Sequence, residues 1–320
     1  MLCPHIEGAH DPVLQQLGAD SLGRYDTFIN RICSDAGVDV PYVRDGTLQV
    51  TDTDEGAADL ARLAALLFSQ GIPCQLADDQ AAVHDLEPLL PPQRAGLLIE
   101  SHGAVRIRDL LEALQQASLH RGVTFRHSER VERVSREGTH LVLDTPAQTL
   151  RADHVVVAAG AWAMNLQVID HPVIPSHPVR GQLLRLQMAS GALRRVLWGS
   201  DIYMVPWGDE VLVGATVEHV GFDSRATVAG VMQLCSAAQR LVPCLAQANF
   251  TEVRVGLRPG SPDGLPLIGA SRRLPGLVYA TGHFRNGALL APLTADLVSD
   301  LIRDPSATVP PALASARFDL

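Results

Sequence analysis

Two glycine-containing motifs near the end of the chain each carry one arginine. Arg258 lies within Gly256–Gly260, and Arg285 lies within Gly282–Leu290. We expect both motifs to form loops, and the second to open onto a helix over residues 288–302. A helix N-terminus offers unpaired N–H groups and a partial positive charge, and a fixed arginine suits a carboxylate. These motifs predict a pocket for a small acid beside a cofactor with an electron-rich edge.

Each arginine and the neighbouring histidine also have a structural interpretation. Arg258 or Arg285 could close a surface turn, although burying either without an anionic partner would be costly. His283 has no carboxylate nearby in sequence to orient it as a base. We therefore favour packing or hydrogen bonding over proton transfer for this histidine.

Tyr203 is one of four tyrosines and lies in an alternating stretch typical of a strand. The alternation places it on the same face as Val205 and opposite Met204. It is either a half-buried aromatic residue or a hydroxyl donor in a site. The sequence contains no Gly-x-Ser-x-Gly turn, no HExxH helix and no paired metal-ligand spacing, so it favours neither a hydrolase nor a metal site.

The composition excludes several classes of enzyme. None of the 320 residues is lysine, so all 26 basic residues are arginine. A Schiff-base lysine and a phosphate-loop lysine are therefore both absent, which excludes pyridoxal-phosphate enzymes and Walker-type ATPases. The formal net charge of −9, without a basic stripe, argues against a nucleic-acid partner.

Five widely spaced cysteines, with no CxxC pair, are typical of reduced thiols in a cytoplasmic protein. No apolar run approaches the ~18 residues that a membrane-spanning helix needs. We therefore expect a cytoplasmic location and no membrane partner.

Two kinds of segment alternate along the chain. The apolar run at 154–159 is typical of a parallel strand buried on both faces, as is the stretch from 276 to Gly282. The segments 46–100 and 172–255 contain stretches typical of antiparallel strands. The turns at Gly160 and Gly282 should meet at one sheet edge, where ligands bind in such folds. We expect a mixed α/β fold with an FAD-binding, Rossmann-like domain (1–40, 101–168 and 256–320) interleaved with a mostly antiparallel β substrate domain (41–100 and 169–255).

The spacing of apolar residues, together with capping residues and helix breakers, predicts several further elements. The stretch 11–36 should be helical with breaks near Gly18 and Gly23, and Asp54 should cap a helix over 55–70. Further expected elements are helices at 108–120 and 226–241 and a strand at 123–125.

The motifs around Arg258 and Arg285 resemble the FAD-dependent D-amino-acid oxidase superfamily, and within it the glycine oxidases that feed thiazole synthesis for thiamine. Val179–Gln182, Val213–Thr216 and the turn from Ala158 to Trp162 match as well. The resemblance covers nearly the whole chain.

The resemblance implies roles for individual residues. Arg258 would bind the substrate carboxylate, assisted by Arg285 and the Tyr203 hydroxyl. Residues implied to contact FAD are Val131 at the adenine, Ala159, Gly160 and Trp162 at the ribose or diphosphate, and Gly282, His283, Asn286, Gly287, Ala288, Leu289 and Leu290 around the flavin.

The implied reaction is hydride transfer from the α-carbon of glycine, another small D-amino acid or a secondary amine to the flavin. The imine would hydrolyse to a keto acid or glyoxylate with release of ammonia or an amine, and molecular oxygen would be reduced to hydrogen peroxide. Such a site needs orientation more than a base. Sarcosine oxidase-like and D-amino-acid dehydrogenase-like activities stay open, as does a homo-oligomer.

One departure from the family pattern concerns the start of the chain. Family members begin with a strand, a Gly-x-Gly-x-x-Gly turn and a helix, a unit of ~30 residues. No such segment occurs here, and Met1–Pro4 resembles a point just after it. A misassigned start and a true truncation are both open, and we expect the chain as given to bind FAD weakly or not at all. A non-enzymatic remnant that binds a small carboxylate or a partner is the alternative function.

Overall fold

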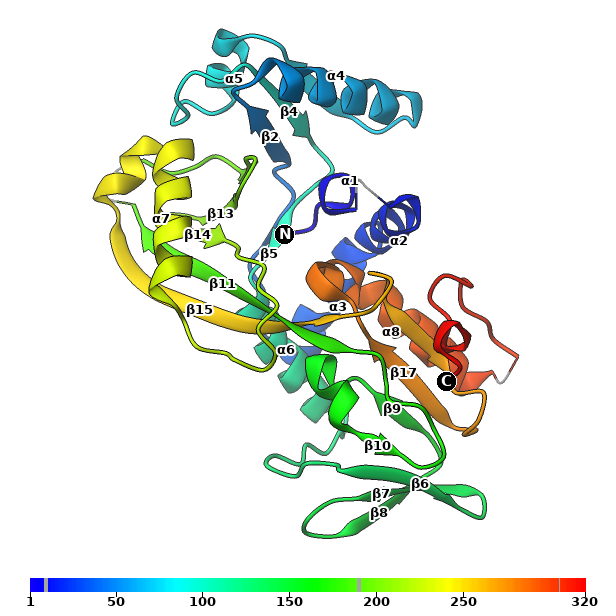
Figure 1. The fold of residues 1–320 in the computed structure, drawn as a ribbon. Coiled ribbons are helices and arrows are strands. Elements are labelled where there is room, and N and C mark those ends of the chain that lie inside the picture. Colours follow the sequence, from blue (N-terminus) through cyan, green and yellow to red (C-terminus); the bar gives the residue numbers. More distant parts are fainter. Residues whose placement is uncertain (9–10, 189–190, 305) are drawn as a thin grey trace.

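The largest sheet described has eight strands (Figure 1). The computed structural model describes residues 1–8, 11–188, 191–304 and 306–320. All neighbouring strands of this sheet are antiparallel except β2 and β12. In spatial order the strands are β15 (Asn249–Gly260), β11 (His177–Gln187), β14 (Glu210–Gly214), β13 (Tyr203–Trp207), β12 (Val196–Trp198), β2 (Thr47–Thr51), β4 (Ala95–Ile99) and β3 (Cys74–Ala77).

Three helices accompany this sheet: α4 (Asp54–Ser69), α5 (Gln80–Leu86) and α7 (Val228–Leu241). Helix α7 begins after Thr227, whose side chain accepts a hydrogen bond from the Gly230 N–H and so satisfies one free donor of the first turn. Its apolar side packs on residues of β11, β13 and β14 to form the main core of this part.

A smaller sheet, β16 (Leu267–Ala270), β17 (Leu277–Thr281) and β9 (Val155–Val157), contains the predicted parallel pair β9–β17. The Thr281 hydroxyl donates to the Gly160 carbonyl at 3.0 Å. The two glycine turns therefore meet at one sheet edge, as predicted. Burial of β9 on both faces was a wrong expectation, because Val155 and Val157 are buried while Val156 is 38% exposed.

Helices α2 (Pro12–Leu22) and α8 (Gly287–Arg303) pack together beside this small sheet (Figure 1). Their neighbours, α3 and α6, form a second helical pair. The remaining elements are α1 (Pro4–Glu7), α3 (Tyr25–Ala36), α6 (Ile107–His120), β1 (Tyr42–Val43) with β5 (Ala104–Val105), the sheet β10 (Gln167–Val168), β6 (Arg133–Glu137), β7 (His140–Asp144) and β8 (Thr149–Ala152), and the 3₁₀ turns η1 (Gly160–Asn165), η2 (Pro243–Gln247), η3 (Phe284–Asn286) and η4 (Ser315–Phe318).

The structure corrects several expected elements. The 11–36 stretch breaks only at Gly23; Gly18 lies inside α2, where a Cβ would fall 2.8 Å from the Pro4 Cβ, so its role is close packing. Helix α4 is capped by Thr53 rather than Asp54, because the Thr53 hydroxyl accepts from the Gly56 N–H. Residues 123–125 form no strand.

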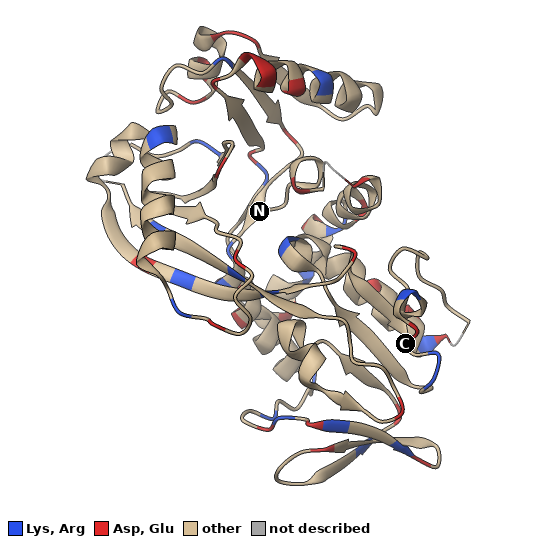
Figure 2. Ribbon diagram, viewed as in Figure 1, with Lys and Arg blue, Asp and Glu red and all other residues tan. Residues whose placement is uncertain are grey.

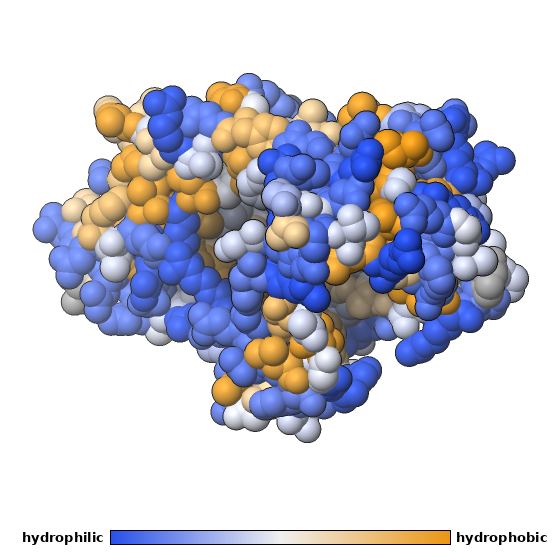
Figure 3. Space-filling view, turned by 90° about the horizontal axis from the view of Figure 1, so that it is seen from below, coloured by the Kyte–Doolittle hydropathy of each residue, from blue (hydrophilic) through white to orange (hydrophobic). Residues whose placement is uncertain are grey.

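Charged residues of both signs are distributed over the fold (Figure 2). On the face seen from below, hydrophobic atoms gather in patches between hydrophilic areas (Figure 3). Within the described ranges, no helix is long and apolar enough to cross a membrane. The domain boundaries given above stay a prediction.

Candidate active site

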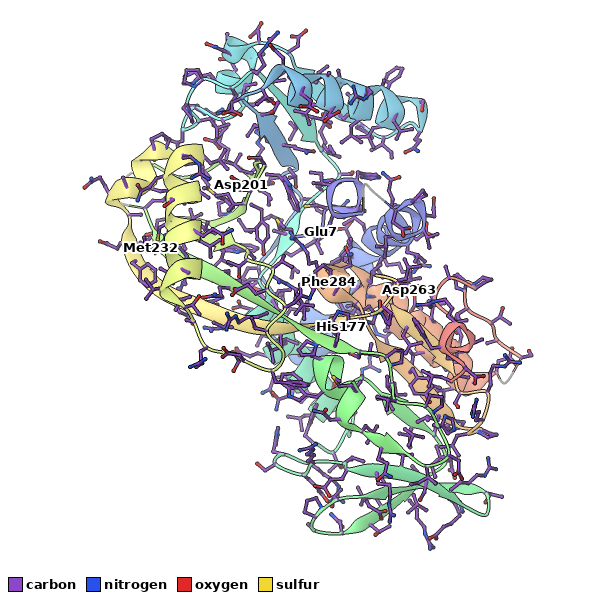
Figure 4. The ribbon with its side chains drawn as sticks, viewed as in Figure 1. Glu7, His177, Asp201, Met232, Asp263 and Phe284 are labelled. Carbon is purple, nitrogen blue, oxygen red and sulfur yellow. The ribbon has the colours of Figure 1, made fainter. Side chains whose placement is uncertain are left out.

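A cavity of about 80 Å³ lies where β13 and β15 approach α1 and the start of α8. Figure 4 shows Glu7 and Phe284 in this central region. Pockets for drug-sized ligands measure about 300–1,000 Å³, so this cavity suits a much smaller molecule. It is lined by Met1, Cys3, Glu7, Tyr203, Arg258, Arg285, Asn286 and Leu289.

Arg258 is held inside the sheet and not in the predicted loop. It lies on β15, paired with Val179 of β11, because the backbone of Gly256–Gly260 continues the strand. Its Nη1 donates to the Thr216 carbonyl at 3.0 Å. No carboxylate of the described residues lies within ion-pairing distance, and burial lowers the pKa of Arg258. A desolvated guanidinium with free donors is a binding site for an anion.

The space for this guanidinium exists because residue 181 is glycine. A Cβ on Gly181 would fall 2.1 Å from Nη2 of Arg258. The two residues lie on neighbouring strands, so any side chain at 181 would compete with the guanidinium for the same space. The sequence motif Val179–Gln182 is thereby linked physically to the motif around Arg258.

A buried polar network fixes the carbonyl that accepts from Arg258. Arg180, 4% exposed, pairs with Glu218 at 2.5 Å and Asp223 at 3.0 Å. The Thr216 hydroxyl donates to Glu218 at 2.6 Å and accepts from the Gln182 N–H at 2.9 Å. Because Thr216 is held on both sides, its carbonyl has a defined position for Arg258.

The network predicts a pH-dependent stability. Burial raises the pKa of Glu218, but the hydrogen bonds from Arg180, Thr216 and Gln182 lower it more, so the pKa falls from its ordinary 4.5 to about 2. A carboxylate whose pKa is lowered by folding stabilises the fold fully above pH 4.5, and this contribution is lost as the pH falls towards 2. The stability gap between the wild type and Glu218→Gln should therefore shrink between pH 5 and pH 2.5, as measured by urea unfolding. A constant gap would contradict the network, and exposed Glu112→Gln is the charge-matched control.

Tyr203 reaches the same cavity from β13. As predicted, it shares a face with Val205, while Met204 is fully buried on the other face. The facing residue is Gly214, where a Cβ would fall 2.6 Å from the tyrosine Cζ. Burial raises the pKa of Tyr203, although both arginines oppose this. The phenol therefore keeps its proton and can donate it to a carboxylate oxygen.

Arg285 lies in η3 and faces both the cavity and an acidic residue. It pairs with Glu7 of α1, with Nη2 at 3.1 Å from Oε2, and its Cζ lies 5.7 Å from the Trp198 ring and 5.9 Å from the Tyr203 ring. The sequence reasoning missed Glu7, as well as Cys3 and Met1. No spacing could have signalled Glu7, because 278 positions separate it from Arg285.

Two larger cavities lie along β9. One of about 660 Å³ is lined by apolar residues that include Val131, Ala159 and Trp162; the other, of about 420 Å³, includes Gly160 and Phe284. Val156 and Ala158 line both, so the two cavities adjoin at β9.

Neighbouring residues of the chain line the small cavity and the cavity of about 420 Å³. Arg258 lines the small cavity and Pro259 the second large one; likewise Arg285 and Asn286 line the small cavity, whereas Phe284 and Gly287 line the large one. The mostly apolar linings of the two large cavities would fit the apolar parts of a cofactor bound along β9.

The predicted cofactor residues fall into three groups. Val131, Ala159 and Trp162 line one large cavity, and Gly160, His283 and Gly287 line the other. Leu290 and Ala288 also make structural contacts: the Leu290 side chain is 2% exposed and packs in a core cluster with Leu17 and Leu293, and the Ala288 carbonyl accepts from the Tyr25 hydroxyl. Asn286 and Leu289 line the small cavity, and Gly282, with φ +75°, turns the chain between β17 and η3.

His283 has the geometry of a hydrogen-bonding residue. Its Nε2 lies 3.0 Å from the Thr294 hydroxyl, and burial lowers the pKa of His283 to about 4. The ring is therefore neutral at physiological pH.

Comparison with known proteins gives consistent results. Residues 1–301 match the family model of FAD dependent oxidoreductases. The chain is 34% identical to glycine oxidase of Geobacillus kaustophilus over 270 residues, which cover 83% of this chain and 71% of that protein. It is 38% identical to the bifunctional protein ThiO/ThiG of Nostoc sp. over 231 residues, 70% of this chain but only 34% of that longer protein.

The fold agrees with these sequence matches. The crystal structure of the G. kaustophilus glycine oxidase superposes with a TM-score of 0.91 at 30% identity, covering 98% of this chain and 86% of that one. The match to the family model over residues 1–301 shows that the chain belongs to the FAD dependent oxidoreductase family, whose cofactor is FAD.

Proposed function

We propose that the protein oxidises glycine or another small amino acid, including small D-amino acids and secondary amines, to the corresponding oxo acid. The observation that carries this proposal is Arg258: its desolvated guanidinium has no carboxylate partner within the part of the chain that the structure describes, and it shares a cavity of about 80 Å³ with Tyr203. The similarity to proteins named glycine oxidase favours glycine among the candidates. The proposal includes a role in supplying thiazole synthesis for thiamine.

The residues of the small cavity bind and orient the substrate. The Thr216 carbonyl holds one end of the Arg258 guanidinium, so its remaining N–H donors can take the substrate carboxylate. The Tyr203 hydroxyl donates a further hydrogen bond to the same group. Fixing the carboxylate restricts the positions that the α-carbon and amine can take, which contributes to the positional part of the rate enhancement.

The cofactor would be held along β9. Val131, Ala159 and Trp162 would contact its adenosine half, and the first turn of α8, from Asn286 to Leu289, would direct N–H groups towards its reactive half. When bound, FAD supplies a hydride acceptor for the substrate α-carbon and transfers the electrons to oxygen, which yields hydrogen peroxide.

The nitrogen lone pair of the neutral amine forms the C=N bond as the hydride leaves, and water then hydrolyses the imine to the oxo acid and ammonia or an amine. No side chain needs to remove a carbon-bound proton. The neutral, Thr294-bonded His283 agrees with this assignment.

The test is purification of the protein with FAD, followed by assays with glycine, sarcosine and D-alanine. Peroxide and glyoxylate formed from glycine would support the proposal. Reduction of a quinone-type acceptor without peroxide would indicate a dehydrogenase instead. Carboxylate binding without any turnover would favour the non-enzymatic alternative. The flavin absorbance of the purified protein measures FAD retention directly. A cytoplasmic location and a homo-oligomer stay predictions.

Replacing Tyr203 with phenylalanine should raise the apparent substrate constant about tenfold and change the turnover number much less. The hydroxyl donates to a charged carboxylate, a bond of about 1.5–3 kcal/mol, and this bond persists from the bound substrate to the transition state. Steady-state kinetics separate the two constants. Tyr42→Phe, which removes a hydroxyl bonded to Asp26, is the matched control. A Tyr203→Phe variant with an unchanged substrate constant would exclude the hydroxyl from carboxylate binding.

A further inference from the structure

The two arginines of the small cavity differ in their charge environment. Both oxygens of the Glu7 carboxylate face Arg285: Oε1 contacts Nε, and Oε2 accepts from Nη2 at 3.1 Å. The side chains of Arg285 and Glu7 are only 22% and 13% exposed, so water screens this pair weakly. Arg258 has no such partner among the described residues.

Glu7 is held in place by its own element. Leu2 and Gly103 exchange backbone hydrogen bonds, with Leu2 N–H to Gly103 carbonyl at 2.8 Å, which anchors the chain just before α1. His5, in the middle of α1, contacts His102 through ring nitrogens 2.9 Å apart, and both rings are buried. The Glu7 carboxylate at the end of α1 is therefore fixed against Arg285.

This arrangement decides how many anionic groups the cavity accepts. The Glu7 carboxylate neutralises the guanidinium of Arg285, so Arg258 is the arginine of this lining that is left without a carboxylate partner among the described residues. A second ligand carboxylate near Arg285 would meet Glu7 at short range in a poorly solvated space, where like charges repel strongly.

We propose that Glu7 sets the charge selectivity of this cavity: by occupying Arg285 it restricts the ligand to one carboxylate and excludes small dicarboxylates. This inference rests on the proposed function, since it assigns the same cavity to the substrate carboxylate. Glu7 is thus a specificity-determining residue, and it acts on the ligand through Arg285.

Oxamate and oxalate are suitable probes, because they have nearly the same shape and differ by one negative charge. Their dissociation constants are measured by ligand-observed NMR with the full chain, with and without added FAD. The wild type should bind oxamate more tightly than oxalate. In Glu7→Gln, the ratio of the two dissociation constants should change in favour of oxalate by about tenfold or more. This change corresponds to the free energy of one charge-assisted hydrogen bond. Exposed Glu112→Gln, the same chemical change on α6, should leave the ratio unchanged.

A second substitution tests whether the effect passes through Arg285. Adding Arg285→Gln to Glu7→Gln should abolish the increase in oxalate affinity, because the guanidinium that Glu7→Gln releases from its ion pair is then missing. If Glu7→Gln does not fold, as judged by circular dichroism, Glu7→Asp should give a smaller shift of the same sign, because its shorter side chain weakens the pair.

Two outcomes separate this inference from the proposed function. A folded Glu7→Gln variant with the wild-type ratio, while Arg258→Ala abolishes oxamate binding, would overturn the selectivity role and leave the carboxylate site intact. Oxamate binding that is insensitive to Arg258→Ala would instead overturn the assignment of the cavity, and the selectivity role with it.

Discussion

Arg258→Ala is expected to raise the apparent substrate constant, or the dissociation constant of a small carboxylate, by about a hundredfold or more. Arg258 is the arginine of the small cavity without a carboxylate partner among the described residues, and its guanidinium can make two charge-assisted bonds of about 1.5–3 kcal/mol each. Steady-state kinetics with added FAD, or NMR titration with oxamate, gives the change. Flavin binding should be unaffected, because the cavities along β9 are lined by other residues.

Two further variants sharpen this test. Arg258→Lys keeps the charge but loses the planar fork of donors, so it should recover only part of the binding. Arg254 lies on the same strand and forms an ion pair with Glu252. Arg254→Ala should therefore leave carboxylate binding near the wild-type value. Equal effects of Arg258→Ala and Arg254→Ala would show a general charge effect and remove Arg258 from the site.

Gly181→Ala is expected to weaken carboxylate binding nearly as much as Arg258→Ala, although residue 181 touches no ligand. The new Cβ would fall 2.1 Å from Nη2 and 2.2 Å from Cζ of Arg258, so the guanidinium has to leave its position. The clash involves the far end of a flexible side chain and spares the backbone pairing. Unfolding in urea should therefore show a modest loss of about 1–3 kcal/mol.

The strand opposite provides a matched control. Gly256 pairs with Gly181 across β11 and β15, and a Cβ there would meet nothing within 4 Å. Gly256→Ala should leave binding unchanged. In the Arg258→Ala background, Gly181→Ala should have no further effect on binding, because the group it displaces is already absent. An additive loss in the double variant would mean that Gly181 acts by another route.

The alternation of apolar and polar residues predicted helices and strands well where the burial of side chains follows the period of the element. The alternation around Tyr203 gave the correct face, because a strand has a fixed period of two. The parallel strands ending at Gly160 and Gly282 were recognisable from their apolar runs and glycines. Exposure of Val156 was not predictable in this way, because it depends on what covers the outer face of β9.

Arg258 illustrates a limit of motif reading. Its glycines and proline favour a loop, yet pairing with β11 keeps the segment extended, because backbone hydrogen bonds to a neighbouring strand outweigh weak local preferences. The position of the arginine in the site was nevertheless predicted, since an arginine among apolar residues needs an anion whether it lies in a strand or a loop.

The sequence by itself determined the family resemblance, the mixed α/β class, the exclusion of lysine chemistry and the candidate arginines, because each depends on residue types and short spacings. Only the tertiary structure decided that Arg258 has no carboxylate partner among the residues it describes while Arg285 is neutralised by Glu7, and that Gly181 makes the space for the guanidinium. The reason is physical: charge and volume act over a few ångströms in space, and these partners are separated by 77 positions or more along the chain, up to the 278 between Glu7 and Arg285.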